Sequence, residues 1–194
     1  SKHKYSKAKR SQEENEALIS QSKRDIKSTR KLSRSEYKSV SKAFENRFHL
    51  RQIEYQNALT GAGKRRAQRK MDINKIVFLT WRIKYIKKKM AENGQVGKPT
   101  GKLHHTMTVL RKQRRKTVHE LSSLYHSREK NLKRKISNLK IQANAAKGTE
   151  KEIFTTKAFY LTINMFRAKE QSRQLRKHEK KLFARRVHRM ENKL

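Results

Sequence analysis

Cysteine, proline, glycine and acidic residues are all scarce in this sequence of 194 residues, and each shortage excludes something. Without cysteine, the sequence has no disulfide, no thiolate metal ligand and no redox nucleophile. One proline and six glycines leave long stretches without a helix breaker, which favours long helices over a sheet with many turns. Hydrophobic residues amount to 33%, so the chain can bury a small core but not a large one.

The shortage of acids leaves a large positive charge. The sequence has 53 Lys and Arg against 16 Asp and Glu, a formal net charge of +37. A compact body with that charge repels itself strongly, so we expect a polyanionic partner. Neutralising the whole charge would take roughly 37 phosphates, or at most about 18 base pairs of duplex per chain.

Long hydrophobic runs are missing as well. The most apolar segment is interrupted at Arg82 and Lys84, and no stretch approaches 18 consecutive apolar residues, so a membrane span is not expected. The first residues, SKHKYSKAKR, lack the apolar centre of a signal peptide, and secretion is not expected.

Residues 1–32 have the composition of a basic N-terminal arm. They mix Ser, Gln and charge with few apolar residues, which is too little apolar surface to fold alone. Ser11 and Glu14 have the spacing of a capping box, so the arm can become helical from about Ser11. A second capping box, Ser33 with Glu36, predicts a helix over 37–59 whose end is marked by glycines at 61 and 63.

The segment KIVFLTWRIKYIKKKM, residues 75–90, combines an apolar run with a block of lysines. Ile83 belongs to an apolar stripe at steps of three and four, and Trp81 widens that stripe toward a second face. The pattern predicts a helix that begins near Lys64 and packs against more than one neighbour. We expect its neighbours to be the similar segment 153–166 and a neighbouring subunit, which together bury Trp81, Ile83 and Phe159 while the lysines point outward to phosphate.

The clearest break is NGQVGKPTG, residues 93–101. Beyond it, residues 102–147 contain neither Gly nor Pro and keep a helical apolar spacing, which predicts a helix roughly 65 Å long. Thr149 and Glu152 form a third capping box before a last helix that becomes basic beyond Arg167. The predicted fold is all-α, with a basic N-terminal arm (1–32) followed by a long-helix bundle of about four helices (33–194). Its core is expected in the apolar parts of 37–59, 73–90, 103–125 and 153–166.

Motifs for catalysis are weak. The segment LTGAGKRR, residues 59–66, has glycines before a lysine, as a phosphate-binding loop does. Such a loop needs a glycine where Ala58 precedes the segment, and it needs Ser or Thr where Arg65 lies. The closest histidine groupings are His104 with His105 and His119 with His126, and neither pair has Asp or Glu at a spacing that would complete a metal site. Most acids lie beside Lys or Arg at helical spacing. We therefore expect neither an enzyme nor a cofactor, metal or small-molecule substrate.

Four basic blocks carry the functional prediction: 64–70, 111–116, 128–135 and 176–181. One such block is usually a solvated face, but four with few compensating acids favour nucleic-acid binding. Charge spread along a whole chain suits phosphate contacts without base readout. Binding to a membrane surface is a weaker rival, because the basic segments lack one-sided Trp and Phe. The predicted phosphate contacts are Lys64, Arg65, Arg66, Arg69, Lys70, Lys84, Lys87, Lys88, Arg111, Lys112, Arg114, Arg115 and Lys116.

An all-α chain with a basic N-terminal arm, long helices, no cysteine and this charge resembles the major capsid proteins of filamentous archaeal viruses of the lipothrixvirus type. In that family two related subunits pair, and their N-terminal helical arms wrap linear double-stranded DNA. The resemblance implies a DNA-coating capsid subunit of a virion, with double-stranded DNA favoured over RNA and a related subunit as partner. It extends the phosphate contacts to Lys23, Arg24, Arg30, Lys31, Arg34, Arg47 and Arg51.

Two alternatives stay open. A ribosomal or ribosome-associated protein also threads basic helices between RNA segments, although such chains commonly use more Gly and Pro. A chromatin-like architectural DNA-binding protein is the other. These alternatives place the chain in the cytoplasm, on the ribosome or in the nucleoid instead of a virion.

Overall fold

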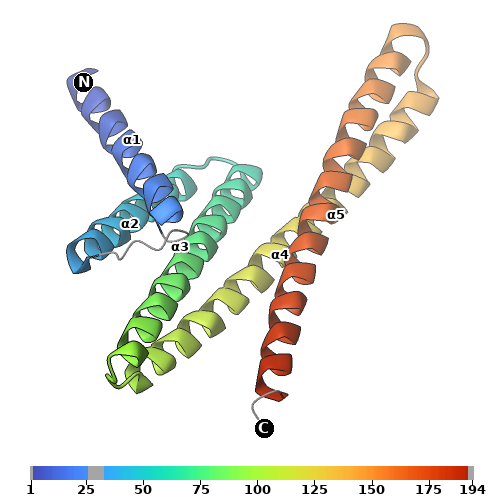
Figure 1. Cartoon of the computed structure of the whole chain (residues 1–194). Coiled ribbons are helices and arrows are strands. Elements are labelled where there is room, and N and C mark those ends of the chain that lie inside the picture. Colours follow the sequence, from blue (N-terminus) through green and yellow to red (C-terminus); the bar gives the residue numbers. More distant parts are fainter. Residues whose placement is uncertain (1, 26–32, 192–194) are drawn as a thin grey trace. The chain divides into compact units, whose positions relative to one another are not determined.

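The structure is a computed structural model that describes residues 2–25 and 33–191 (Figure 1). These residues form five helices: α1 (Lys2–Asp25), α2 (Arg34–Gln56), α3 (Gly61–Gln95), α4 (Gly101–Ala145) and α5 (Gly148–Glu191). No strand occurs within the described ranges, and the all-α prediction is confirmed. The chain divides into two compact units, Ser1–Thr117 (unit 1) and Val118–Leu194 (unit 2). The division falls inside α4, whereas the predicted break at 93–101 separates α3 from α4.

The helix starts show where local sequence signals act. The capping box at Ser33 is present, because the Ser33 hydroxyl accepts the Glu36 N–H and the Glu36 carboxylate accepts the Ser33 N–H. At α3, Thr60 is the N-cap and its hydroxyl accepts the Gly63 N–H at 3.0 Å. The two glycines therefore lie in the first turn of α3. The prediction that they end α2 is wrong, because α2 already ends at Gln56. The predicted start at Ser11 is also wrong, because α1 already runs through that position.

The break after α3 is a Schellman turn. Gly97 has a φ of 67°, a left-handed conformation that glycine adopts without steric cost. The Gly97 N–H donates to the Gly94 carbonyl and the Lys98 N–H to the Asn93 carbonyl, which satisfies the carbonyls at the end of α3. Pro99 follows, and α4 begins at Gly101. The long helix predicted from Lys102 agrees with α4 at its start and lies within two residues of it at its end.

Unit 1 has an aromatic core where α1, α2 and α3 meet. Ile19, Val40, Ala43, Phe44 and Trp81 are buried together. Phe44 stacks on Phe78 with ring centroids 4.9 Å apart and lies 6.1 Å from Trp81. Across the same helices, the Asn74 side-chain amide donates to the Phe44 carbonyl at 3.3 Å. The cluster fixes α2 on one face of α3.

A second cluster covers the other face of α3. Leu79, Ile83 and Ile86 pack there against Met107 and Leu110 from the beginning of α4. The two clusters together explain the apolar half of residues 75–90, and the prediction that this helix has more than one neighbour is confirmed. Within unit 1, the neighbours are α1 and α2 on one side and α4 on the other.

The second half of α1 also belongs to this core. Ile19 has no exposed surface and Ser22 is buried, with its hydroxyl donating to the Ile19 carbonyl. At the end of the helix, the Lys88 ammonium donates to the Asp25 carbonyl, a favourable place for a cation. Leu18, the neighbour of Ile19, is exposed. The segment that composition alone marks as an arm therefore packs on unit 1, with Ile19 as its buried apolar residue.

Unit 2 is a hairpin of the second part of α4 and α5 (Figure 1). Its buried residues on α5 are small: Ala158, Ala168 and Ser172. Ser172 meets Ser122 of α4, with their hydroxyl oxygens 2.9 Å apart. Small side chains at the contact let two helices approach closely, because the interaxial distance depends on the side chains between them.

Two predicted parts of the core are largely exposed. In segment 153–166 of the single chain only Ala158 is buried, and Phe159 is exposed by 62%. The burial of Phe159, which was predicted with a neighbouring subunit present, stays a prediction. In segment 37–59 the buried residues are Val40, Ala43 and Phe44, while Leu59 is fully exposed. The apolar period was present in both segments, but no helix of the described chain covers these side chains.

Candidate nucleic-acid interface

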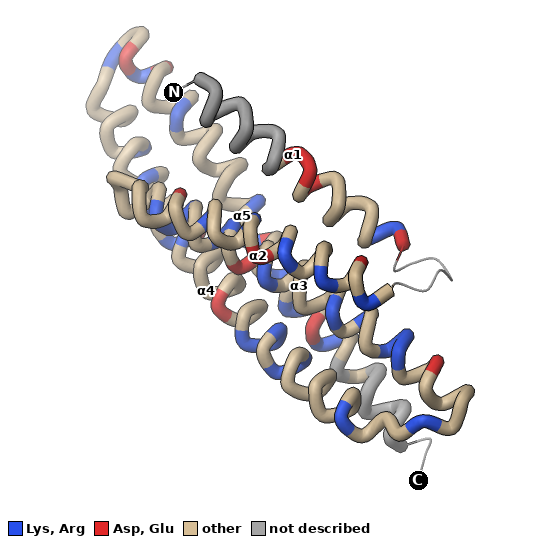
Figure 2. Tube along the Cα trace, turned by 90° about the vertical axis from the view of Figure 1, so that its left-hand side faces the viewer, with Lys and Arg blue, Asp and Glu red and all other residues tan. Residues whose placement is uncertain are grey.

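Lys and Arg are spread along α3, α4 and α5 with few Asp and Glu between them, whereas the coloured part of α1 carries more acids than cations (Figure 2). Most of the predicted phosphate contacts are exposed, and the others are partly buried. Arg30 and Lys31 lie outside the described residues. The exposed members are Lys23, Arg24, Arg34, Lys64, Arg65, Arg66, Lys84, Lys87, Lys112, Arg115 and Lys116. The partly buried members are Arg47, Arg51, Arg69, Lys70, Lys88, Arg111 and Arg114.

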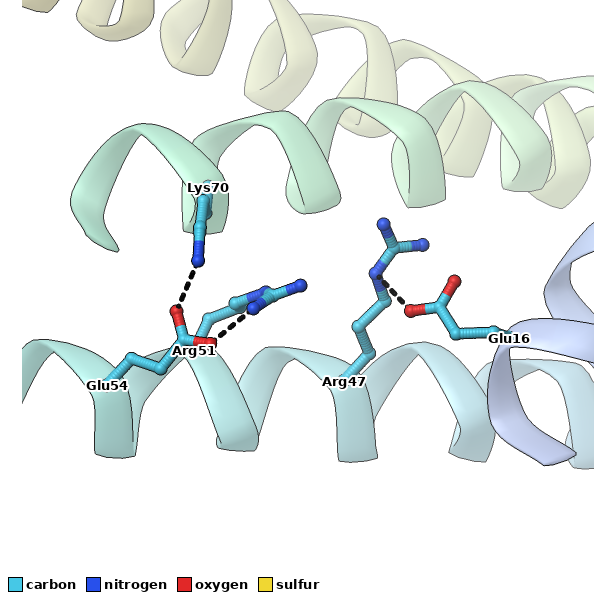
Figure 3. Close-up of polar contacts among 5 residues, drawn as sticks. All are labelled: Glu16, Arg47, Arg51, Glu54 and Lys70. Carbon is cyan, nitrogen blue, oxygen red and sulfur yellow. Dashed lines mark hydrogen bonds and ion pairs between the residues drawn. The ribbon is translucent and has the colours of Figure 1, made fainter. Parts of the chain in front are cut away.

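Three of the partly buried cations bind acids of neighbouring helices or turns (Figure 3). Arg47 Nε lies 3.1 Å from a carboxylate oxygen of Glu16, which ties α2 to α1. Glu54 of α2 binds two cations: Arg51 of the same helix, and Lys70 of α3, whose Nζ lies at 3.0 Å. The contact with Lys70 ties α3 to α2. These cations hold helices together, and a phosphate would have to compete with a carboxylate for them.

Glu54 shows the electrostatic effect of that arrangement. Partial burial raises the pKa of its carboxyl, but the hydrogen bond from Lys70 and the charges of Arg51 and Lys70 outweigh burial, and the pKa lies below 4.5. The carboxylate is therefore ionised at neutral pH and offsets part of the cation pair beside it.

Aromatic rings hold two other cations of α3. Arg82 lies over the Phe78 ring, 5.6 Å from its centroid, and donates from Nε to the Tyr37 hydroxyl at 3.1 Å. The Lys89 ammonium lies 5.9 Å from the centroid of Tyr85. Such contacts are worth roughly 0.5–1 kcal/mol at exposed sites. The cations of the KIVFLTWRIKYIKKKM segment thus differ in exposure. Lys84 is exposed, whereas Arg82 and Lys89 are partly buried against aromatic rings.

The exposed cations of unit 1 form patches on separate helices. Lys64, Arg65 and Arg66 occupy the first turns of α3. Lys112 and Lys116 lie on α4 one helical turn apart, on the same side, with a rise of about 6 Å between them. Repulsion between such neighbours falls when an anion comes between them. The arrangement suits contacts to several phosphates along a backbone.

The densest cationic site is in unit 2 and was not among the predicted contacts. A groove of about 530 Å³ lies between α4 and α5. Five cations of α5 line it, namely Lys169, Arg173, Arg176, Lys177 and Lys180, and Glu129 is the one acid. The sequence signal was the basic block 176–181, but Lys169 and Arg173 precede it. Only the pairing of the two helices brings these residues to one groove.

Two buried hydroxyls position one arginine of this groove. The Arg176 Nε–H donates to the Ser122 hydroxyl at 2.9 Å. Ser122 is 1% exposed and contacts Ser172, whose hydroxyl also lies 3.3 Å from the Ser122 carbonyl. Because one N–H of the guanidinium is anchored at the seam, its remaining N–H groups have a defined direction and less side-chain entropy to lose on binding an anion.

Other kinds of site find no support in the described part of the chain. Its His, Asp and Glu residues do not gather in groups of three or more that could hold a metal ion. None of the helices, within the residues described, has the length and apolarity to cross a membrane. Comparison with protein-family models, with curated proteins and with solved structures found no match.

Proposed function

We propose that the protein coats nucleic acid through phosphate contacts that do not depend on base sequence. The carrying observation is the net charge of +37 on helices whose exposed cations are spread over several faces. Arg47 and Lys70 bind carboxylates within the fold, whereas Lys64, Lys112 and Lys116 are exposed. A polyanion is the partner that offsets the remaining repulsion.

The resemblance to filamentous-virus capsid proteins extends this proposal. In its extended form the nucleic acid is double-stranded DNA, the protein is a structural subunit of a virion, and a related subunit pairs with it along a filament. Architecture and composition support this form: five long helices, a basic N-terminal segment and no cysteine. Electron microscopy of the native particle tests it directly, because a filament favours the capsid role and a ribosome favours the alternative of an rRNA-binding protein.

The salt dependence of affinity tests the electrostatic part of the proposal. Affinity for random duplex should fall by orders of magnitude between about 50 and 200 mM salt. The double variant Lys112→Gln/Lys116→Gln removes two exposed charges, and we expect it to reduce the slope of log K against log salt by up to about 2. Its thermal stability should stay within about 0.5 kcal/mol of the parent.

The matched control is Lys70→Gln/Lys89→Gln. It removes the same charge from two lysines held by Glu54 and Tyr85, so its salt slope should change less. A shallow salt slope with a strong preference for one sequence would overturn phosphate coating. Equal slopes for the two double variants would show that net charge alone, and not the exposed faces, determines binding.

A further inference from the structure

Unit 2 exposes large aromatic side chains on α5. Phe159 and Tyr160 are each 62% exposed and Phe166 is 58% exposed. Phe159 and Tyr160 contact each other edge to face, with centroids 5.9 Å apart. Large aromatic rings that unit 2 leaves exposed in the apolar first half of a helix mark a binding surface.

The exposed rings and two cations of the groove lie on the same side of α5. Phe159, Phe166, Arg173 and Lys180 follow one another at intervals of seven residues. Seven residues are nearly two turns of an α-helix, so the four positions lie along one side of α5 with a drift of about 20° per step. Arg173 and Lys180 belong to the groove, and the two rings lie beyond its Lys169 end. The side of α5 thus carries a track of two rings followed by cations, about 30 Å long.

We propose that this side of α5 binds an unpaired nucleic-acid strand, with bases stacked on Phe159 and Phe166 and phosphates held by the cations of the α4–α5 groove. The inference rests on the proposed nucleic-acid binding and adds to the coating of duplex a surface in unit 2 that takes an unpaired strand. Aromatic platforms beside a cationic groove are what single strands require, because each base presents a π-face and each nucleotide a charge. In a duplex the base faces are already stacked and cannot meet the rings.

The geometry suits this occupant better than a second copy of the chain. An isologous contact centred on the groove would bring Arg173, Lys177 and Lys180 of two copies toward one another, and like charges in contact are unfavourable. A nucleic-acid strand offers the complementary charge. The anchored guanidinium of Arg176 gives the groove a preorganised phosphate contact, since Ser122 already holds its Nε.

Three ligands separate stacking from charge: a single-stranded DNA of about 15 nucleotides, the same strand with abasic positions, and the corresponding duplex. Phe159→Ala/Phe166→Ala should weaken binding to the base-containing single strand roughly tenfold or more. It should leave binding to the abasic strand and to the duplex unchanged. Both rings are exposed, so circular dichroism and thermal unfolding should match the parent protein.

Two further variants sharpen the result. Phe159→Leu/Phe166→Leu keeps apolar side chains but removes the rings, and it should lose most of the same affinity if stacking is responsible. Arg173→Gln/Lys180→Gln should lower the salt slope for the single strand and retain the difference between base-containing and abasic strands.

Several results would overturn the inference. One is an unchanged affinity of the alanine variant for the single strand, and another is an equal loss of affinity for single strand and duplex. A third is sedimentation showing that the parent protein is an oligomer and the alanine variant is not. In each case the parent protein can still bind duplex with a steep salt slope, and the proposed coating function then stands without the single-strand surface. If the parent protein binds none of the three ligands, both proposals fail.

Discussion

The two units of this chain use aromatic residues in opposite ways. In unit 1, Phe44 and Trp81 are buried, at 1% and 2% exposure, inside a stacked cluster contributed by three helices. In unit 2, Phe159 and Phe166 extend from α5 into solvent. Both sequences have apolar residues at helical spacing, so periodicity identifies a face that can be buried, but the partner that buries it decides between a core and a binding surface.

Charge follows the same division. Unit 1 places acids where helices meet, as Glu16 does with Arg47 and Glu54 with Lys70. The groove of unit 2 gathers five cations of α5, Lys169, Arg173, Arg176, Lys177 and Lys180, with Glu129 as the one acid of its lining. Arg173 also lies 3.7 Å from the carboxylate of Glu170. Unit 1 thus uses part of its charge to join helices, whereas unit 2 concentrates charge at an open groove.

The largest expected effect is a matched pair of phenylalanine substitutions. Phe44→Ala should lower the free energy of unfolding of unit 1 by roughly 3–5 kcal/mol, because it removes a ring from a packed core and leaves a cavity. Phe159→Ala should change stability by no more than about 0.5 kcal/mol. Circular dichroism during denaturant unfolding follows the helices of both units, whereas the fluorescence of Trp81, the one tryptophan of the sequence, reports on unit 1. Similar losses from both substitutions would contradict the contrast between the units.

A second pair asks whether α1 belongs to the core of unit 1. Ile19→Ala should destabilise unit 1 toward the lower end of roughly 2–5 kcal/mol, because α1 can shift and partly close the cavity. Leu18→Ala is the control, because this substitution removes a similar side chain from the same helix at a position that is 42% exposed. The readout is again the fluorescence of Trp81, because Trp81 lies in the same cluster as Ile19. If neither substitution matters, α1 is an arm that unit 1 does not need.

The smallest effect concerns acid pH. The folded-state pKa of Glu54 is lowered, so its ion pairs contribute stability above the unfolded-state pKa and lose it as pH falls through the folded-state value. The carboxylate is 40% exposed, and we expect no more than about 0.5 kcal/mol. The unfolding free energy of Glu54→Gln should therefore fall less than that of the parent protein between about pH 6 and pH 3. Glu45→Gln, the same charge change at an exposed position of α2, is the control. A steeper fall in Glu54→Gln would contradict the pKa direction.

Local signals in the sequence predicted the helices well. The Ser33 capping box and the break at 93–101 depend on a few neighbouring residues, and both occur as predicted. The two-sided stripe of residues 75–90 also predicted a helix with neighbours on two faces. These features need no knowledge of distant parts of the chain.

Pairing between distant residues could not be read from periodicity. The burial of Ile19 depends on α2 and α3, and nothing in its own surroundings distinguishes it from the exposed Leu18. The groove of unit 2 requires α4 and α5 to lie side by side, so its cations are spread over a range wider than the basic block at 176–181. The prediction that 153–166 is core failed because apolar spacing does not show whether a partner exists.

The short link between α4 and α5 sets an order in which unit 2 can assemble. Ala146 and Lys147 alone join the two helices, so contacts near the link close small loops and lose little chain entropy. The contact between Ser122 and Ser172 closes a loop of 50 residues and, in a hairpin that zips from Gly148, forms late. Arg176 acquires its hydroxyl partner only with that last step. A hairpin frayed at the open end would therefore keep its turn and lose its organised anion groove first.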